Sequence, residues 1–294
     1  MILTALVSTE ILEPHLADPD WIVFDCRHDL AAPERGRSEY AMSHIPGARF
    51  LHLDEDLSAP KTGRNGRHPL PGPQVLMEKL GRAGVDARKQ VVAYDAQGGM
   101  VASRLWWLLR WLGHLPVAVL DGGWDRWIKE GRPQTAEIPR PAPARFNGKP
   151  KRIVVSAESV RSQLDDGTTL LLDARAPDRY RGQNETIDPV AGRIPGARNR
   201  HYRDNLDAGG RFKAPEALRR EFRAVLGAAK PEDIVSYCGS GVSACHNLLA
   251  MEVAGLHGAR LYPGSWSEWS ADPSRPIAAG DPEAISGEPR PGER

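Results

Sequence analysis

The sequence has few cysteines and no long apolar run. Only Cys26, Cys238 and Cys245 occur among its 294 residues, too few for a disulfide framework, which indicates a reducing compartment. The most apolar stretch, residues 105–112, contains Arg110 and is far too short to span a bilayer. The N-terminal residues lack the basic region and the cleavage site of a secretory signal. We therefore predict a cytoplasmic protein that does not associate with membranes.

An excess of one charge is also missing. Lys and Arg together number 39 and Asp and Glu 38, so the formal net charge is +1 and gives no electrostatic argument for binding nucleic acid. The histidines form no H-E-x-x-H motif and the cysteines no C-x-x-C motif, so no metal site is expected. A phosphate-binding loop and a dinucleotide fingerprint are absent as well, so no cofactor is expected.

The sequence repeats itself after about half its length. The recurring pairs, in chain order, are VSTEIL and VSAESV, VFDCR and LLDAR, HIPGAR and RIPGAR, VVAYD and IVSYC, and DGGWDRW and PGSWSEW. Such a series indicates a duplicated domain. We predict a first domain over residues 1–132, a proline-rich linker over 133–152 and a second domain over 153–280, followed by a disordered tail over 281–294 that is rich in proline, glycine and charge.

Each copy alternates short β-like runs with helical runs. In the first copy, strands are predicted at 21–25, 48–50, 91–94 and 116–120, and helices at 104–112 and 124–129. This alternation predicts the α/β class: tandem duplicated domains, each a mostly parallel sheet flanked by helices. Functional sites in such sheets lie where the strands end, along the carboxyl edge. Cys238 and its first-copy counterpart Asp95 both lie at such an end.

Cys238 begins a glycine-rich turn between a predicted strand at 234–237 and a predicted helix at 244–253. The first N–H groups of a helix have no partner inside it and, together with the helix dipole, favour an anion. We expect the Cys238 thiolate to be that anion and to act as a nucleophile, the alternative being a buried structural cysteine. Asp95 places a carboxylate where the second copy has this thiol, so the first domain is predicted to lack catalytic activity.

The two α/β copies, the loop CGSGVSA and the later block YPGSWSEW resemble the two-domain rhodanese superfamily. Within it, the loop at 238–243 resembles that of 3-mercaptopyruvate sulfurtransferases. Thiosulfate sulfurtransferases resemble the rest of the chain equally well, but they usually place basic residues directly after the cysteine. The resemblance implies an enzyme whose Cys238 takes a sulfane sulfur from 3-mercaptopyruvate as a persulfide. The acceptor would be cyanide or a thiol, including that of a thioredoxin-like protein, and thiosulfate is the alternative donor.

The resemblance also implies roles for the loop. The amides of Gly239, Gly241, Val242 and Ser243 would surround the substrate sulfur, as an oxyanion hole surrounds oxygen. Ser240 would bind the donor sulfur or help to move a proton, and its alternative is to cap the helix.

Three side chains outside the loop complete the predicted site. Arg179 in RYRG is implied to hold the carboxylate of the donor. The second arginine of the family pattern is absent from NETIDPVAG, which makes Arg181 its candidate substitute, with a surface ion pair as the alternative. His44 resembles a cleft-lining position that assists proton transfer, and its alternative is a structural histidine held by backbone hydrogen bonds. If the polar loop at 61–73 folds over the cleft, Arg67 and His68 can reach it.

Two other classes of protein share part of this pattern. Cysteine phosphatases also hold a cysteine at a helix N-terminus, but their loop ends in an arginine that binds phosphate, and here Ala244 follows the loop. A binding module without activity could lose its cysteine, and the presence of Cys238 argues against that class.

Overall fold

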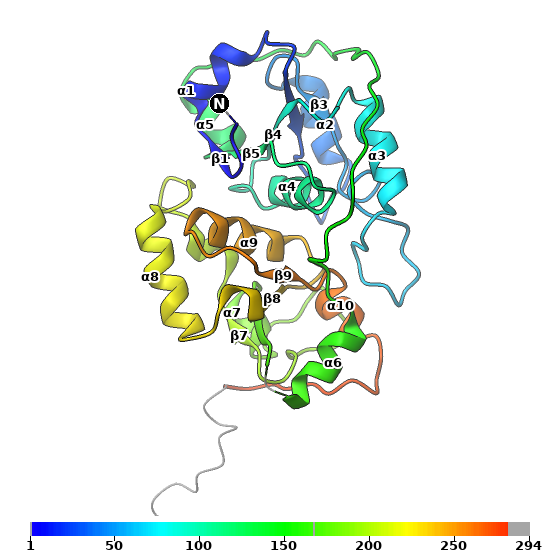
Figure 1. Cartoon of the computed structure of the whole chain (residues 1–294), viewed down its shortest axis with the longest axis vertical. Coiled ribbons are helices and arrows are strands. Elements are labelled where there is room, and N and C mark those ends of the chain that lie inside the picture. Colours follow the sequence, from blue (N-terminus) through cyan, green and yellow to red (C-terminus); the bar gives the residue numbers. More distant parts are fainter. Residues whose placement is uncertain (1, 167, 282–294) are drawn as a thin grey trace, which may run out of the picture.

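The computed structural model of the chain describes residues 2–166 and 168–281. The predicted tail therefore lies outside the described residues, apart from Asp281. Figure 1 shows two α/β units, the first in blue to teal and the second in green to red, which meet along helices α4 and α9.

The first unit contains the strands β1 (Leu6–Val7), β2 (Trp21–Asp25), β3 (Arg49–Phe50), β4 (Gln90–Tyr94) and β5 (Val117–Leu120), and the helices α1 (Thr9–Leu12), η1 (Glu13–His15), α2 (Arg35–Met42), α3 (Pro73–Arg82), α4 (Ala102–Trp111) and α5 (Gly123–Lys129). The second contains β6 (Leu170–Asp173), β7 (Arg198–Asn199), β8 (Ile234–Tyr237) and β9 (Arg260–Leu261), and α6 (Ala157–Asp166), α7 (Pro177–Tyr180), η2 (Tyr202–Asn205), α8 (Pro215–Leu226), η3 (Pro231–Asp233), α9 (Ser243–Val253) and α10 (Ser265–Trp269).

The two sheets have related topologies. The first has the strand order β1-β5-β4-β2-β3 and the second β7-β6-β8-β9. All paired strands in both sheets are parallel. The predicted fold, two parallel sheets flanked by helices, is confirmed. The central strands β4 and β8 are buried along their whole length, as continuous apolar runs in parallel sheets are expected to be.

Apolar periodicity explains how the helices cover these sheets. In α8 the buried residues are Leu218, Phe222 and Leu226, spaced four apart, which puts them on one face of the helix. The helices α4 and α9 are buried on almost every side, because each lies between its own sheet and the other unit. Within the described residues, no helix is both long enough and apolar enough to cross a lipid bilayer.

The contact between α4 and α9 makes one continuous apolar core across both units, and Cys238 belongs to that core. The loop that begins with Cys238 leads directly into α9, so it lies where the two units meet (Figure 1). Side chains from the first unit can therefore reach a site built on the second sheet.

Candidate active site

Cys238 follows β8 at the carboxyl edge of the second sheet, and only 2 % of its surface is exposed. The N–H of Gly241 donates to its Sγ at 3.1 Å. Gly241 has φ 78°, and a Cβ there would lie 2.3 Å from the carbonyl oxygen of Pro263, so only glycine fits. The helix α9 begins at Ser243 and directs its positive end toward the loop. This environment favours an anionic sulfur.

The matching loop of the first unit shows what such a turn binds. The carboxyl group of Asp95 accepts four backbone N–H groups, from Gln97, Gly99, Val101 and Ala102, at 2.7–2.9 Å. Burial raises the pKa of Asp95, and these four donors act in the opposite direction. The strand–turn–helix unit is therefore a cradle for a negatively charged group, filled by a carboxylate in the first unit and by sulfur in the second.

Ser240 takes part in a chain of three polar side chains. His68 Nδ1 lies 2.7 Å from Ser240 Oγ, and His68 Nε2 lies 3.4 Å from Asp54 Oδ1. Burial lowers the pKa of His68, while Asp54 acts in the opposite direction, so the neutral ring can accept the Ser240 proton at Nδ1. His68 and then Lys61 hold the pKa of Asp54 well below its usual range. The arrangement can move a proton to and from Ser240.

Two arginines from different units stand beside the loop. Arg179 Nη2 lies 2.8 Å from Glu185 Oε1 and 3.0 Å from Asp188 Oδ2. Arg67 Nε donates to Asp188 Oδ1 at 2.9 Å, so Asp188 joins the two cations. A Cβ on Gly239 would lie 2.6 Å from Arg67 Nη2 and 3.6 Å from Arg179 Nη2. Both guanidinium groups thus border the same space next to the cysteine.

These side chains line a pocket of about 190 Å³. The predicted site residues in its lining are Arg179, Cys238, Gly239, Ser240, Val242 and Ser243. Gly241 is not part of the lining, but its N–H donates to Cys238 Sγ. The loop at 61–73 folds over the site and adds Arg67 and His68 to the lining, and the remaining walls include Met100 and Tyr202.

Two predicted residues lie elsewhere, so their predicted place in the cleft is wrong. His44 is fully buried in the first unit, with Nδ1 2.7 Å from the Tyr40 carbonyl and Nε2 3.0 Å from the Glu137 carbonyl. Both ring nitrogens are engaged by backbone, so neither can exchange a proton with a substrate. Arg181 points to the surface, where Nε lies 3.3 Å from Gln183 Oε1 and 3.8 Å from Asp281 Oδ1.

Asp54 was not predicted as a site residue. Nothing in its local sequence, HLDEDL, distinguishes it from a surface carboxylate. Only the fold of the following loop brings His68 to it.

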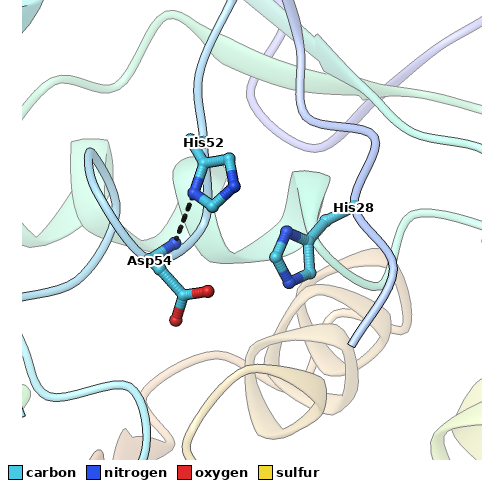
Figure 2. Close-up of side chains that lie close together, drawn as sticks. All are labelled: His28, His52 and Asp54. Atoms are coloured by element: carbon cyan, nitrogen blue, oxygen red, sulfur yellow. Dashed lines mark hydrogen bonds between the residues drawn. The ribbon is translucent and has the colours of Figure 1, made fainter. Parts of the chain in front are cut away.

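Asp54 also lies beside His28 and His52 (Figure 2), and one possible ligand atom of each falls within 4.8 Å of the others. His52 Nδ1 accepts the N–H of Asp54 at 3.2 Å, and its Nε2 lies 3.1 Å from the Pro33 carbonyl. His52 therefore has no free lone pair to offer a cation. Burial lowers the pKa of His28 to about 4, so its neutral ring could offer a lone pair, but without His52 the group offers too few ligands. We assign no metal to this group.

Comparison with known proteins places the chain in a family. The model of the rhodanese-like domain matches twice, over residues 8–130 and 156–272. The first match covers β2 to β5 and the second covers β6 to β9, each with the loop that follows its central strand. The chain belongs to the rhodanese family, with one complete cysteine loop in its second copy.

Individual relatives cover nearly the whole chain. The chain is 47% identical over 279 residues to the "Probable 3-mercaptopyruvate sulfurtransferase" of Pseudomonas aeruginosa, covering 94% of this chain and 98% of that protein. It is 34% identical over 278 residues to the thiosulfate sulfurtransferase of Bos taurus, covering 90% and 91%. The solved structure of 3-mercaptopyruvate sulfurtransferase from Leishmania major superimposes with a TM-score of 0.81 at 28% identity, covering 91% of this chain and 74% of that one.

Proposed function

We propose that the protein is a sulfurtransferase that takes sulfur from 3-mercaptopyruvate as a Cys238 persulfide and passes it to a thiol or to cyanide. One observation carries the proposal: a cysteine sulfur that accepts the Gly241 N–H shares a small pocket with three arginines, Arg67, Arg175 and Arg179, and with a Ser240–His68 pair. The names of the relatives support sulfur transfer, and both donor classes occur among them.

Arg179 and Arg67 are suited to the carboxylate of the donor. A planar guanidinium binds a carboxylate through two parallel N–H donors. The second arginine that the sequence following Arg179 lacks is supplied here by the first unit, through Arg67. With the carboxylate at these two cations, the sulfur at the other end of a three-carbon acid can reach Cys238.

The first half-reaction forms the persulfide. The Cys238 thiolate attacks the donor sulfur, an S–S bond forms, and the carbon–sulfur bond of the donor breaks. The bonding electrons stay on the methylene carbon as the enolate of pyruvate. Ser240 accepts the proton of the donor thiol while passing its own to His68 Nδ1, and the same path returns a proton to the enolate carbon. Pyruvate leaves, and no external proton is needed.

The second half-reaction restores the enzyme. A thiolate of the acceptor attacks the outer sulfur, the S–S bond to Cys238 breaks, and the acceptor leaves as a persulfide; cyanide would leave as thiocyanate. We propose a thioredoxin-like protein as one thiol acceptor. A cytoplasmic location is part of the proposal and is supported by the three free cysteines, which suit a reducing compartment.

The loops that carry Asp95 and Cys238 indicate different roles for the two domains. We propose a non-catalytic domain over 1–132 and a catalytic domain over 153–280, joined by the linker at 133–152, and the matches at 8–130 and 156–272 support these boundaries. The first domain contributes Arg67, His68 and Asp54 to a site whose nucleophile is in the second.

The charges around the pocket favour mercaptopyruvate over thiosulfate. Thiosulfate is a dianion and needs an excess of positive charge next to the thiolate. Among the arginines of the pocket lining, Arg67 and Arg179 are already neutralised by Asp188 and Glu185, and Arg175 pairs with Asp173. The two residues after the cysteine, Gly239 and Ser240, are themselves uncharged.

Steady-state kinetics with each donor and one common acceptor test the proposal. We expect a higher kcat/KM for 3-mercaptopyruvate than for thiosulfate. A clear preference for thiosulfate would show that the donor is wrong while leaving the persulfide chemistry intact. Absence of sulfur transfer from either donor would refute the proposed function.

A further inference from the structure

Arg104 on α4 is a fully buried cation that has no carboxylate partner among residues 2–166 and 168–281. Its Nη1 donates to the Gly241 carbonyl and its Nη2 to the His68 carbonyl, both at 3.0 Å. Its Nε has no hydrogen-bond partner within the described part of the chain. Burial lowers the pKa of Arg104, but a guanidinium stays protonated in proteins. A buried charge without a counter-ion destabilises the folded state, so a functional reason for the position of Arg104 is expected.

The two carbonyls that accept from Arg104 belong to Gly241, which contacts the Cys238 sulfur, and to His68, which contacts Ser240. The N–H of Gly241 donates to Cys238 Sγ at 3.1 Å. The ring of His68 bonds Ser240 Oγ at 2.7 Å. A single side chain from the first unit thus fixes both the sulfur cradle and the proton relay from the interior.

The other charges near the cysteine are already compensated. The groups that face the loop are Arg67 and His68 from the first unit, Arg175, Arg179, Asp188 and His201 from the second, and Arg104 and Cys245 from the buried side. Arg175 is paired with Asp173 at 2.7 Å, and burial lowers the pKa of His201. Asp188 pairs with both Arg67 and Arg179, and Glu185 pairs with Arg179 again. Burial raises the pKa of Cys245 to about 12, so that thiol is uncharged. Among these groups, Arg104 is the cation that no acid neutralises.

We propose that Arg104, although it lies in the non-catalytic domain, supplies the positive charge that stabilises the Cys238 thiolate and, later, the persulfide anion. When the sulfur is ionised it is the counter-ion that the buried guanidinium otherwise lacks. Arg104 is also a positioning residue, because it holds Gly241 and His68 in place. This inference rests on the proposed function, since it assigns the anion to the sulfur that reacts.

The test measures how the rate of Cys238 alkylation by iodoacetamide depends on pH, with the modified cysteine identified by mass spectrometry. Arg104→Gln keeps a hydrogen-bond donor but removes the charge, whereas Arg104→Lys keeps the charge. We expect the pH midpoint to rise by about one unit or more in the Gln variant, the size of shift that a nearby opposite charge produces. In the Lys variant we expect it to stay within about half a unit of the parent, by the same charge argument.

Arg110→Gln on the same helix is the matched control, because Arg110 is partly exposed and is paired with Glu252. Its midpoint should equal that of the parent. An unchanged midpoint in a folded Arg104→Gln variant would overturn the proposal, even if kcat falls. If that variant does not fold, Arg104→Met, which removes the charge without burying an unpaired polar group, decides: a rise of about one unit supports the proposal, and a midpoint near that of the parent overturns it. Alkylation uses no sulfur donor, so the result is independent of the donor assignment.

Discussion

Replacement of Arg67 by methionine removes a cation that the first domain contributes to the pocket of the second. Arg67 Nε donates to Asp188 Oδ1 at 2.9 Å, and Arg67 Nη2 lies next to Gly239. Loss of a hydrogen bond between charged groups costs about 1.5–3 kcal/mol, which corresponds to roughly a ten- to hundredfold change. Because the donor carboxylate must share Arg67 with Asp188, we expect the lower end of this range, about tenfold.

The assay varies mercaptopyruvate at saturating acceptor and then the acceptor at saturating donor. In Arg67→Met, kcat/KM for the donor should fall about tenfold, and kcat/KM for the acceptor should stay the same, because the carboxylate has left before the acceptor arrives. Arg181→Met is the matched control, since Arg181 lies at the surface outside the pocket. An unchanged donor kcat/KM in Arg67→Met, or an equal loss for both substrates, would refute a role of Arg67 in carboxylate binding.

Three further predictions concern the nucleophile, the proton relay and a buried histidine. Cys238→Ser should abolish sulfur transfer, whereas Cys245→Ala and Cys26→Ala should retain most activity in the same assay, since both thiols are buried away from the pocket lining. The donor half-reaction should slow only as the pH falls below 6.5, because burial lowers the His68 pKa and the neutral ring is the reactive form. In His68→Gln the rate should fall about 100-fold and should no longer decrease at acidic pH. A His68→Gln variant with the full rate would exclude the relay. Burial lowers the pKa of His246 from 6.5 to about 4, so the unfolded chain binds the proton first as the pH falls. The free energy of unfolding, measured with urea, should therefore decrease by about 3 kcal/mol as the pH is lowered from 6.5 to about 4, and His246→Gln should flatten that dependence.

Local sequence patterns predicted most of the fold. The strand at 21–25 coincides with β2, and the helix at 124–129 begins one residue after α5 does. These elements are determined by apolar runs and turn residues that lie within a few positions of one another. The duplication then predicted that the second sheet repeats the first, because matching blocks occur in the same order.

The site was only partly predictable, because its side chains come from both domains. The loop at 238–243 was found from its own residues, since a strand, a glycine turn and a helix start are local features. Arg67 meets Asp188 across 121 positions, and no local pattern gives the direction in which a long polar loop folds. His44 was placed wrongly because resemblance to a family position gives the residue type and not the direction of its side chain.

The mass of the intact protein after incubation with 3-mercaptopyruvate, in the absence of acceptor, shows whether Cys238 carries the transferred sulfur. We expect the addition of one sulfur atom per chain, located on Cys238 by peptide analysis and removed by a thiol. Cys238→Ser should gain no sulfur, and Asp95, at the matching position of the first domain, should remain unmodified. A chain that stays unmodified with both 3-mercaptopyruvate and thiosulfate, or one that carries the sulfur on Cys26 or Cys245, would show that Cys238 is not the sulfur carrier.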